Sequence, residues 1–139
     1  AALMEETRAQ FGMAILIDCH SMPSALSVPD IVLGDRYGAS AAPALTAHAE
    51  AAFLRAGFSV ARNSPYAGGH STVLYGRVGS GWHALQIEIN RALYLDEERI
   101  AKRPTFDMLR VRLMRAMQAL VELPQSLRAL PPSLPQAAE

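Results

Sequence analysis

The residues best suited to chemistry follow an apolar run near the start of the chain. The run Ile15-Leu16-Ile17 leads directly into Asp18, Cys19, His20 and Ser21. In α/β proteins, ligands and catalytic groups collect at the carboxyl ends of buried strands. Because Asp18 and His20 are two positions apart, their side chains would project from the same face of a strand. His20 is therefore a candidate metal ligand or general base. The alternative is a structural histidine at a strand end, hydrogen-bonded to Asp18 or Ser21.

Glu88 is the second candidate, because its neighbours in the sequence are mostly apolar. It belongs to the segment His83–Ile89, whose leucine and isoleucines would face one side of a strand while Gln86 and Glu88 face the other. A carboxylate in such a strand is either paired with a cation such as Arg91 or functional. As a general base, it would have its pKa tuned towards neutrality by burial. Metal-activated water together with such a base is the usual equipment for amide hydrolysis.

The remaining histidines do not complete a metal site, and Gly68-Gly69 does not form a recognisable phosphate-binding motif. His48, His70 and His83 have no compact metal-ligand spacing with His20, and the sequence contains neither an HExxH motif nor paired CxxC motifs. No complete zinc site can therefore be assembled from local motifs. The pair Gly68-Gly69 lacks a following Lys-Ser/Thr, and no helix is expected to begin there, so it is a weak match to a phosphate loop.

Three arginines are placed where a small anionic ligand could be bound. Arg36, Arg62 and Arg91 follow expected strands or lie in loops that could form a site. A guanidinium group binds a carboxylate through two parallel hydrogen bonds, so these positions would suit an anionic substrate. The alternative for each of them is a surface arginine in a loose salt bridge.

Hydrophobic periodicity predicts an α/β protein in which helices pack on a sheet. A helix should end at Gly12, and Met13–Asp18 should form a strand buried on both faces, followed by a loop over residues 20–29. The expected strands are residues 13–18, 31–33, 58–61 and 83–89, with a short extended stretch at 72–75, and the expected helices are residues 1–10, 41–56 and 104–121. We expect one α/β domain over residues 1–123 and a proline-rich, weakly ordered tail over residues 124–139.

Composition narrows the class of protein but names no reaction. Of the 139 residues, 50% are hydrophobic and 19% are charged, which is ordinary for a soluble globular domain. The 13 basic and 13 acidic residues cancel, so no overall field would attract nucleic acid or an anionic membrane. The single cysteine excludes an internal disulfide, and no apolar run is long enough to span a bilayer. These features predict a cytoplasmic protein.

Four blocks of this sequence resemble the N-formylglutamate amidohydrolase (deformylase) family in content and order. The blocks are residues 17–23 (IDCHSMP), 33–36 (LGDR), 63–69 (NSPYAGG) and 83–97 (HALQIEINRALYLDE). They cover most of the chain from Ile15 to Glu97, which corresponds to the C-terminal half of a family member. The resemblance implies a three-layer αβα fold with a mixed, mostly parallel central sheet of the zinc-carboxypeptidase or phosphorylase/hydrolase type, which would here lack its N-terminal part.

The same resemblance implies roles for particular residues. His20 would be the third zinc ligand, supported by Asp18 and Ser21, and Glu88 would be the catalytic carboxylate. The positions matching substrate-binding motifs, which would bind the substrate's carboxylates or polarise its carbonyl, are Arg36, Asn63, Tyr66 and Arg91. The family's other two zinc ligands would lie upstream of residue 1.

The leading hypothesis is a zinc-dependent amide hydrolase that releases formate from N-formyl-L-glutamate in histidine degradation. Its substrate would be a small anionic N-acyl amino acid, with one zinc ion as cofactor. One alternative is another carboxypeptidase-like hydrolase acting on an acylated amino acid or a cell-wall peptide. A second alternative, from a different class, is a catalytically incomplete domain that only binds a ligand or a partner.

Overall fold

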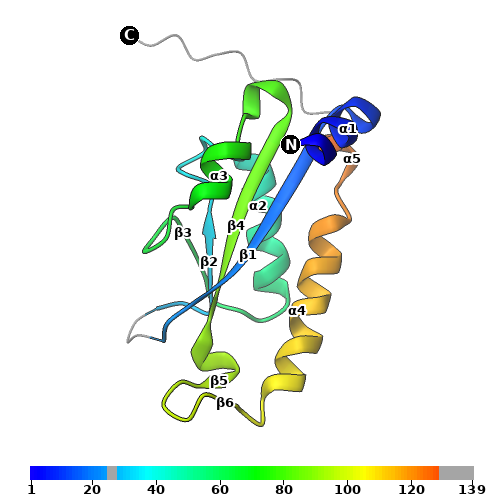
Figure 1. Ribbon diagram of the computed structural model, residues 1–139. Helices are drawn as coiled ribbons and strands as arrows, with labels where there is room; N and C mark the ends of the chain where they lie inside the picture. The colour runs from blue at the N-terminus through cyan, green and yellow to red at the C-terminus, as the bar shows by residue number, and fades with distance from the viewer. Residues whose placement is uncertain (25–27, 129–139) are drawn as a thin grey trace.

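The computed structural model describes residues 1–24 and 28–128, which form a mixed sheet with helices on both faces (Figure 1). The sheet has four strands in the order β1-β4-β2-β3. Strand β1 (Ala14–Met22) is parallel to β4 (Trp82–Asn90), β4 is antiparallel to β2 (Ile31–Gly34), and β2 is parallel to β3 (Val60–Arg62). The sheet is therefore mixed and mostly parallel, as the family resemblance implied.

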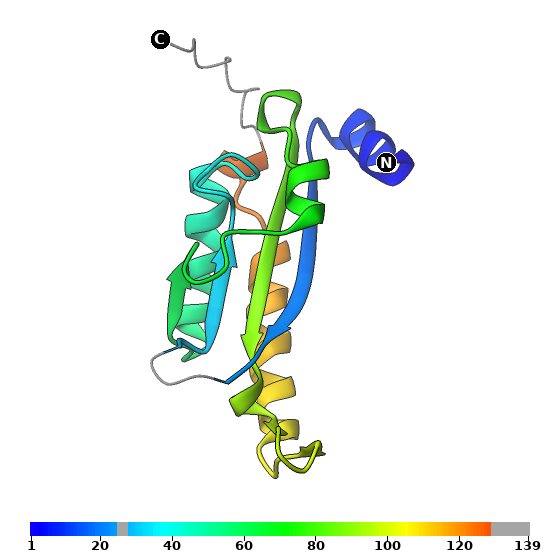
Figure 2. The ribbon, with the colours of Figure 1, turned by 60° about the vertical axis from the view of Figure 1, so that its left-hand side comes forward.

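The helices form the layers on either side of this sheet. Helices α2 (Pro43–Arg55) and α4 (Phe106–Val121) pack against each other on one face, and α3 (His70–Tyr75) lies against β4 and β1 on the other (Figure 2). Helix α1 (Ala2–Phe11) precedes β1 and ends at Gly12. The shorter elements are η1 (Val78–Ser80), η2 (Arg91–Leu93), β5 (Leu95–Asp96), β6 (Ala101–Lys102) and α5 (Gln125–Arg128). Among the described residues, no helix is long and apolar enough to cross a membrane.

The main core lies between the sheet and the pair α2 and α4, where the sequence pattern placed it. Leu85 and Ile87 of β4 are buried there and Ile89 packs beside them, so the predicted alternation along this strand is confirmed. The two helices expected over residues 41–56 and 104–121 are also confirmed. Their buried apolar residues include Leu45, Ala49, Ala52, Phe53, Leu109 and Leu120. Full burial of each leucine or phenylalanine side chain contributes about 1.5–3 kcal/mol to folding, which fixes the sheet against these helices.

Three sequence predictions were wrong in detail. Strand β1 continues to Met22, so His20 lies within the strand and not in the loop expected over residues 20–29. It is also partly exposed along most of its length, because among the described residues only β4 pairs with it. Residues 72–75, expected to be extended, belong to helix α3, which begins at His70 directly after Gly69. The absence of apolar periodicity in this six-residue helix explains the error.

The proline-rich end of the chain is described only in part. Residues 125–128 form α5, in which Leu127 is buried, and residues 129–139 lie outside the described part of the chain. The division into a domain over residues 1–123 and a tail over residues 124–139 stays a prediction.

Candidate functional site

His20 and Glu88 face each other across two neighbouring parallel strands. They are register partners in the β1–β4 pair, and Nδ1 of His20 lies 3.9 Å from Oε1 of Glu88. Nε2 of His20 lies 2.9 Å from Oδ2 of Asp18, two positions earlier on the same face. If the Nε2 proton is donated to Asp18, the lone pair of Nδ1 remains available on the side of Glu88. The strand pairing thus joins the two candidates that the sequence singled out.

The two side chains of this pair differ in solvent exposure. The His20 side chain is 46% exposed, whereas the Glu88 side chain is only 8% exposed. Buried Glu88 accepts a hydrogen bond of 2.7 Å from Nε2 of Gln86. The other amide atom of Gln86, Oε1, is buried and has no hydrogen-bond partner among the described residues. Gln86 therefore holds one oxygen of Glu88 in place. The alternation in the sequence had indicated that the two side chains share a face of the strand, but not that they form a hydrogen bond.

Arg91 is tied to the strand that carries His20. Its Nε and one terminal nitrogen donate to the hydroxyl and the carbonyl of Ser21, both at 3.3 Å, and its other terminal nitrogen lies 3.5 Å from Oε1 of Glu97. Glu97 also accepts hydrogen bonds from the backbone N–H and the hydroxyl of Ser24. The hydroxyl and the N–H of Ser24 lower the pKa of the Glu97 carboxyl, desolvation opposes them, and the cation of Arg91 lowers the pKa further. This network holds the segment that follows β1 against the segment that follows β4.

A second group of polar residues lies where β2 and β3 end. The buried Asp35 carboxylate accepts hydrogen bonds from Nδ2 of Asn63 at 2.8 Å, from the hydroxyl of Thr46 at 2.7 Å and from the N–H of Gly38 at 3.1 Å. Oδ1 of Asn63 accepts in turn from the N–H groups of Asp35 and Tyr37, at 3.1 and 3.4 Å. Asn63 was expected to be functional from its motif, but roles for Asp35 and Thr46 could not be predicted, because a turn sequence does not show which polar groups bond to each other.

The other predicted substrate-binding residues remain open to solvent. Arg36 is exposed, and within the described residues its guanidinium makes no hydrogen bond or ion pair. Tyr66 is 39% exposed in the loop between β3 and α3. Arg62, by contrast, is paired with Glu50 on α2. The side chains of Arg36 and Tyr66 are therefore free to meet a ligand.

His83 and His48 have structural surroundings, Cys19 is not activated, and His70 is exposed. His83 is 3% exposed, and its Nδ1 accepts a hydrogen bond of 3.3 Å from the N–H of Ala42, while burial lowers its pKa from 6.5. His48 bonds to the carbonyl of Ala119 on α4. Burial, and secondarily the charge of Asp18, raises the pKa of the Cys19 thiol, so Cys19 is not an activated nucleophile. Among the described residues, no group of three or more metal-ligating side chains comes together.

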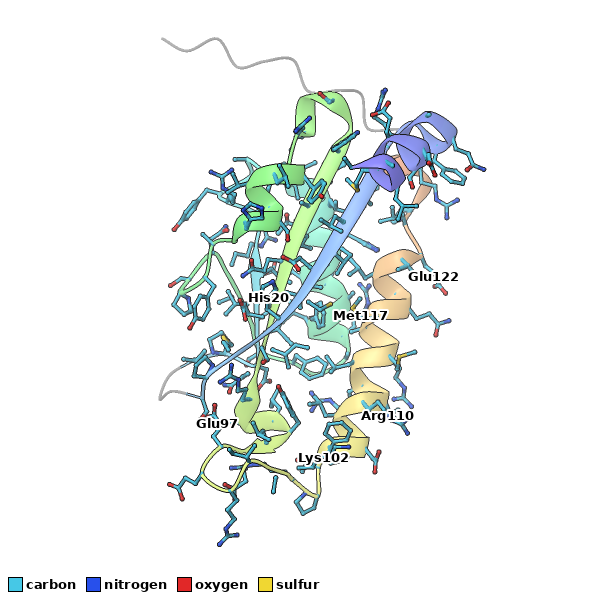
Figure 3. The ribbon with its side chains drawn as sticks, in the orientation of Figure 1. His20, Glu97, Lys102, Arg110, Met117 and Glu122 are labelled. Carbon is cyan, nitrogen blue, oxygen red and sulfur yellow. The ribbon has the colours of Figure 1, made fainter. Side chains whose placement is uncertain are left out.

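A large apolar groove runs between β1 and α4, on the side of the sheet away from Glu88. Its volume is about 510 Å³, and most of its lining comes from α4, including Leu113 and Met117. Figure 3 shows Met117 on the side of α4 turned towards the sheet and Glu122 pointing away from it. Cys19, His20 and Ser21 of β1 also line the groove, so it borders the candidate metal ligand, whereas Glu88, Gln86 and Arg36 do not line it.

Comparisons with known proteins agree with the motifs at this site. The model of the N-formylglutamate amidohydrolase family matches residues 1–95. N-formylglutamate deformylase of Pseudomonas aeruginosa is 40% identical over 98 residues, which cover 66% of this chain and 37% of the relative. The enzyme of the same name from Pseudomonas putida is 35% identical over 101 residues, which cover 68% of this chain and 38% of the relative.

The fold agrees as well. The crystal structure of N-formylglutamate amidohydrolase from Ralstonia eutropha JMP134 matches with a TM-score of 0.75 and 31% identity, covering 84% of this chain and 46% of that one. The chain thus spans less than half the length of the relatives that it matches. The match of the family model to more than half of the sequence establishes that the chain belongs to the N-formylglutamate amidohydrolase family.

Proposed function

We propose that this chain forms part of a zinc-dependent amide hydrolase that releases formate from N-formyl-L-glutamate. The observation that carries the proposal is the pair His20 and Glu88, 3.9 Å apart on adjacent strands within the family's motifs. An imidazole beside a buried carboxylate is the equipment expected of a metal-assisted amide hydrolase. Histidine degradation in the cytoplasm is the setting that we expect for this activity.

The donor atoms present fit one corner of a zinc site. Nε2 of His20 is held by Asp18, and zinc-binding histidines almost always direct their second nitrogen to such an acceptor. One imidazole cannot hold zinc, because a catalytic site uses three protein ligands. The described residues bring no second and third ligand to His20. We propose that further ligands are supplied from outside residues 1–139, upstream in the sequence.

The reaction would cleave the bond between the formyl carbon and the amide nitrogen. Bound zinc would supply Lewis-acid chemistry, polarising the formyl oxygen and lowering the pKa of the attacking water. Glu88 would accept one proton from that water as the new C–O bond forms, and would deliver it to the leaving nitrogen. The products would be formate and L-glutamate. Gln86 would hold Oε1 of Glu88, the oxygen that lies 3.9 Å from Nδ1 of His20, in a fixed orientation.

Substrate carboxylates would be bound by cations around this pair. Arg36 presents a free guanidinium, and Tyr66 an exposed phenol. Arg91 would contribute its positive charge beside Ser21, although Glu97 neutralises part of it. A dianionic N-acyl amino acid matches this set, because guanidinium groups bind carboxylates in a fixed bidentate geometry.

Zinc content and a substrate panel test the proposal. The intact protein, including the upstream segment proposed to supply the other ligands, is analysed for bound metal before and after chelation. Formate or amine release is followed for N-formyl-L-glutamate, N-acetyl-L-glutamate, N-formyl-L-methionine and a cell-wall peptide. We expect stoichiometric zinc, loss of activity on chelation, and the highest kcat/KM for N-formyl-L-glutamate. A higher kcat/KM for another amide would favour the broader hydrolase. Absence of both zinc and hydrolysis would favour a domain that only binds.

A further inference from the structure

The loop after β2 is fastened to the loop after β3 around a single residue, Arg36. Oδ1 of Asn63 accepts from the N–H groups of Asp35 and Tyr37, the residues on either side of Arg36. Nδ2 of Asn63 donates to the Asp35 carboxylate, which the Thr46 hydroxyl anchors to helix α2. Every polar atom of the Asn63 side chain is thus engaged with this loop.

The backbone of the loop needs these bonds. Arg36, Tyr37 and Asn63 have φ angles of 53°, 56° and 58°, in the left-handed region. That conformation is unfavourable for residues with a Cβ, and least so for asparagine and aspartate, whose side chains can bond locally. Arginine and tyrosine have no such local bond to offer. Their conformation is therefore maintained by the partners of the loop, among which Asn63 supplies the central acceptor.

The neighbouring glycine loop fixes the stem of Arg36. The Arg36 N–H donates to the carbonyl of Ala67 at 2.7 Å. A Cβ on Gly68 would lie 3.0 Å from Cγ of Arg36, and a Cβ on Gly34 would lie 2.8 Å from the backbone of residues 67 and 68. The two loops therefore touch along the aliphatic part of Arg36. The guanidinium itself is bonded to nothing in the described residues.

Close contacts connect this loop pair to the candidate catalytic residues. A Cβ on Gly69 would lie 3.0 Å from Oε1 of Gln86, and Nε2 of Gln86 donates to Glu88. Gly34 is also the register partner of Gln86 in the antiparallel pair of β2 and β4. The loop that carries Arg36 thus packs against Gln86, which donates to Glu88 on the same face of β4.

We propose that Asp35 and Asn63 are positioning residues that hold the Arg36 guanidinium for one carboxylate of the substrate, and that Asn63 itself does not touch substrate. This inference rests on the proposed function for the identity of the substrate. It assigns the selection of a carboxylate-bearing substrate to Arg36. The side-chain amide of Asn63 affects Arg36 indirectly, because it bonds to the backbone N–H groups of Asp35 and Tyr37, the residues on either side of that arginine.

A double-mutant cycle on the purified protein tests this inference. Asn63→Gly removes the side chain but retains a residue that adopts positive φ without strain, so the loop can still form. Arg36→Ala removes the guanidinium, and Gln118→Ala on the exposed side of α4 is the matched control for loss of an amide. The probes are N-formyl-L-glutamate and its two monoamides, N-formyl-L-glutamine and N-formyl-L-isoglutamine.

Arg36→Ala should weaken binding of N-formyl-L-glutamate by on the order of 10- to 100-fold, since it removes a charge-assisted hydrogen bond. The loss should vanish for the monoamide that lacks the recognised carboxylate. Asn63→Gly should raise KM and Kd about tenfold with a smaller change in kcat, but should add little in the Arg36→Ala background. Gln118→Ala should change nothing.

Two readouts separate this inference from the proposed function. The cycle is measured on Kd as well as on KM, so it can be read even if the protein hydrolyses none of the probes. Hydrogen exchange of the Asp35 and Tyr37 amides, followed by NMR without ligand, should be faster in Asn63→Gly. Additive effects of the two substitutions, unchanged exchange at both amides, or a wild-type protein that binds none of the probes would each overturn the inference. Absence of hydrolysis alone would overturn only the proposed function.

Discussion

His20 of β1 and Glu88 of β4 are direct register partners in parallel strands, with His20 Nδ1 and Glu88 Oε1 3.9 Å apart. A shift of this pairing by one residue would turn one of the two side chains to the opposite face of the sheet. The apolar contacts of β4 with α2 and α4 oppose such a shift, because they bury Leu85 and Ile87 on the other face. The core thus sets the geometry of the candidate site.

Glu88→Gln should abolish turnover while leaving the fold and metal binding in place. The substitution keeps the size of the side chain and can still accept the bond from Gln86, but a neutral amide cannot take a proton from water. General base catalysis typically contributes about 10²- to 10⁴-fold, so we expect a loss of that order in kcat. Steady-state kinetics with N-formyl-L-glutamate and metal analysis of the same preparation measure both effects. Activity close to that of the wild type would remove Glu88 from its proposed role.

Asp18→Asn should weaken zinc binding without removing a ligand. Asp18 holds Nε2 of His20 at 2.9 Å, and loss of such a support typically costs about 10- to 100-fold in metal affinity. His20→Ala should have a larger effect, because it removes the donor atom itself. Competition for zinc with a chromophoric chelator ranks the variants. Since His20 is about half exposed, thermal unfolding of the metal-free proteins should change little, and equal zinc affinity in all three proteins would contradict the assignment.

Gly34→Ala should destabilise the protein by crowding two loops. A Cβ at this position would lie 2.8 Å from backbone atoms of residues 67 and 68, so the loop must move. Overpacking of this kind typically costs about 1–3 kcal/mol in the free energy of unfolding, measured by urea denaturation. Gly12→Ala is the matched control, because its φ of 81° strains alanine while its Cβ would meet nothing within 4 Å. NMR shifts at Ala67 and Gly68 should change only in Gly34→Ala, and unchanged shifts there would contradict the packing argument.

The stability of the fold should fall as the pH drops below about 6.5, in part because of His83. Burial lowers the pKa of His83 in the folded protein below its ordinary value of 6.5. Between the two pKa values the unfolded chain binds a proton that the folded chain does not, so stability rises with pH across this window and is fully present above 6.5. In His83→Gln, whose amide oxygen can accept from Ala42, the free energy of unfolding should depend less on pH. The exposed His70→Gln should retain the wild-type dependence, and identical curves for wild type and His83→Gln would refute this explanation.

The core and its main elements could be predicted from the sequence because burial imposes a period on it. The alternation in β4 and the spacing of apolar residues in α2 and α4 indicate which side of each element is buried. The strand was expected to end at Asp18, since His20 and Ser21 are polar, but the ladder with β4 continues to Met22 regardless of their polarity. His20 and Glu88 were each predicted to be functional residues, and the register of β1 with β4 places them side by side. Their chemical roles stay predictions.

Contacts between loops could not be predicted from the periodicity of the sequence. Asn63 and Asp35 are far apart in sequence, and neither belongs to a periodic element that would reveal the direction of its side chain. The sequence therefore pointed to Asn63 as a residue of interest without indicating whether it faces a ligand or a neighbouring loop. Its bonds to Asp35 and Tyr37 answer the structural part of that question, and its effect on a ligand remains to be measured.

The parallel pairing of β1 with β4 has a consequence for the order of folding events. The chain between these strands contains β2, α2, β3 and α3, all of which must be accommodated before the two strands can align. Contacts between segments so far apart in sequence carry a large loop-closure cost and form slowly. Helices such as α2 and α4 can begin to form from local contacts, whereas the pairing of His20 with Glu88 requires segments far apart in the sequence to meet. A partly folded chain would therefore lack the His20–Glu88 pair, even with most of its helical structure in place.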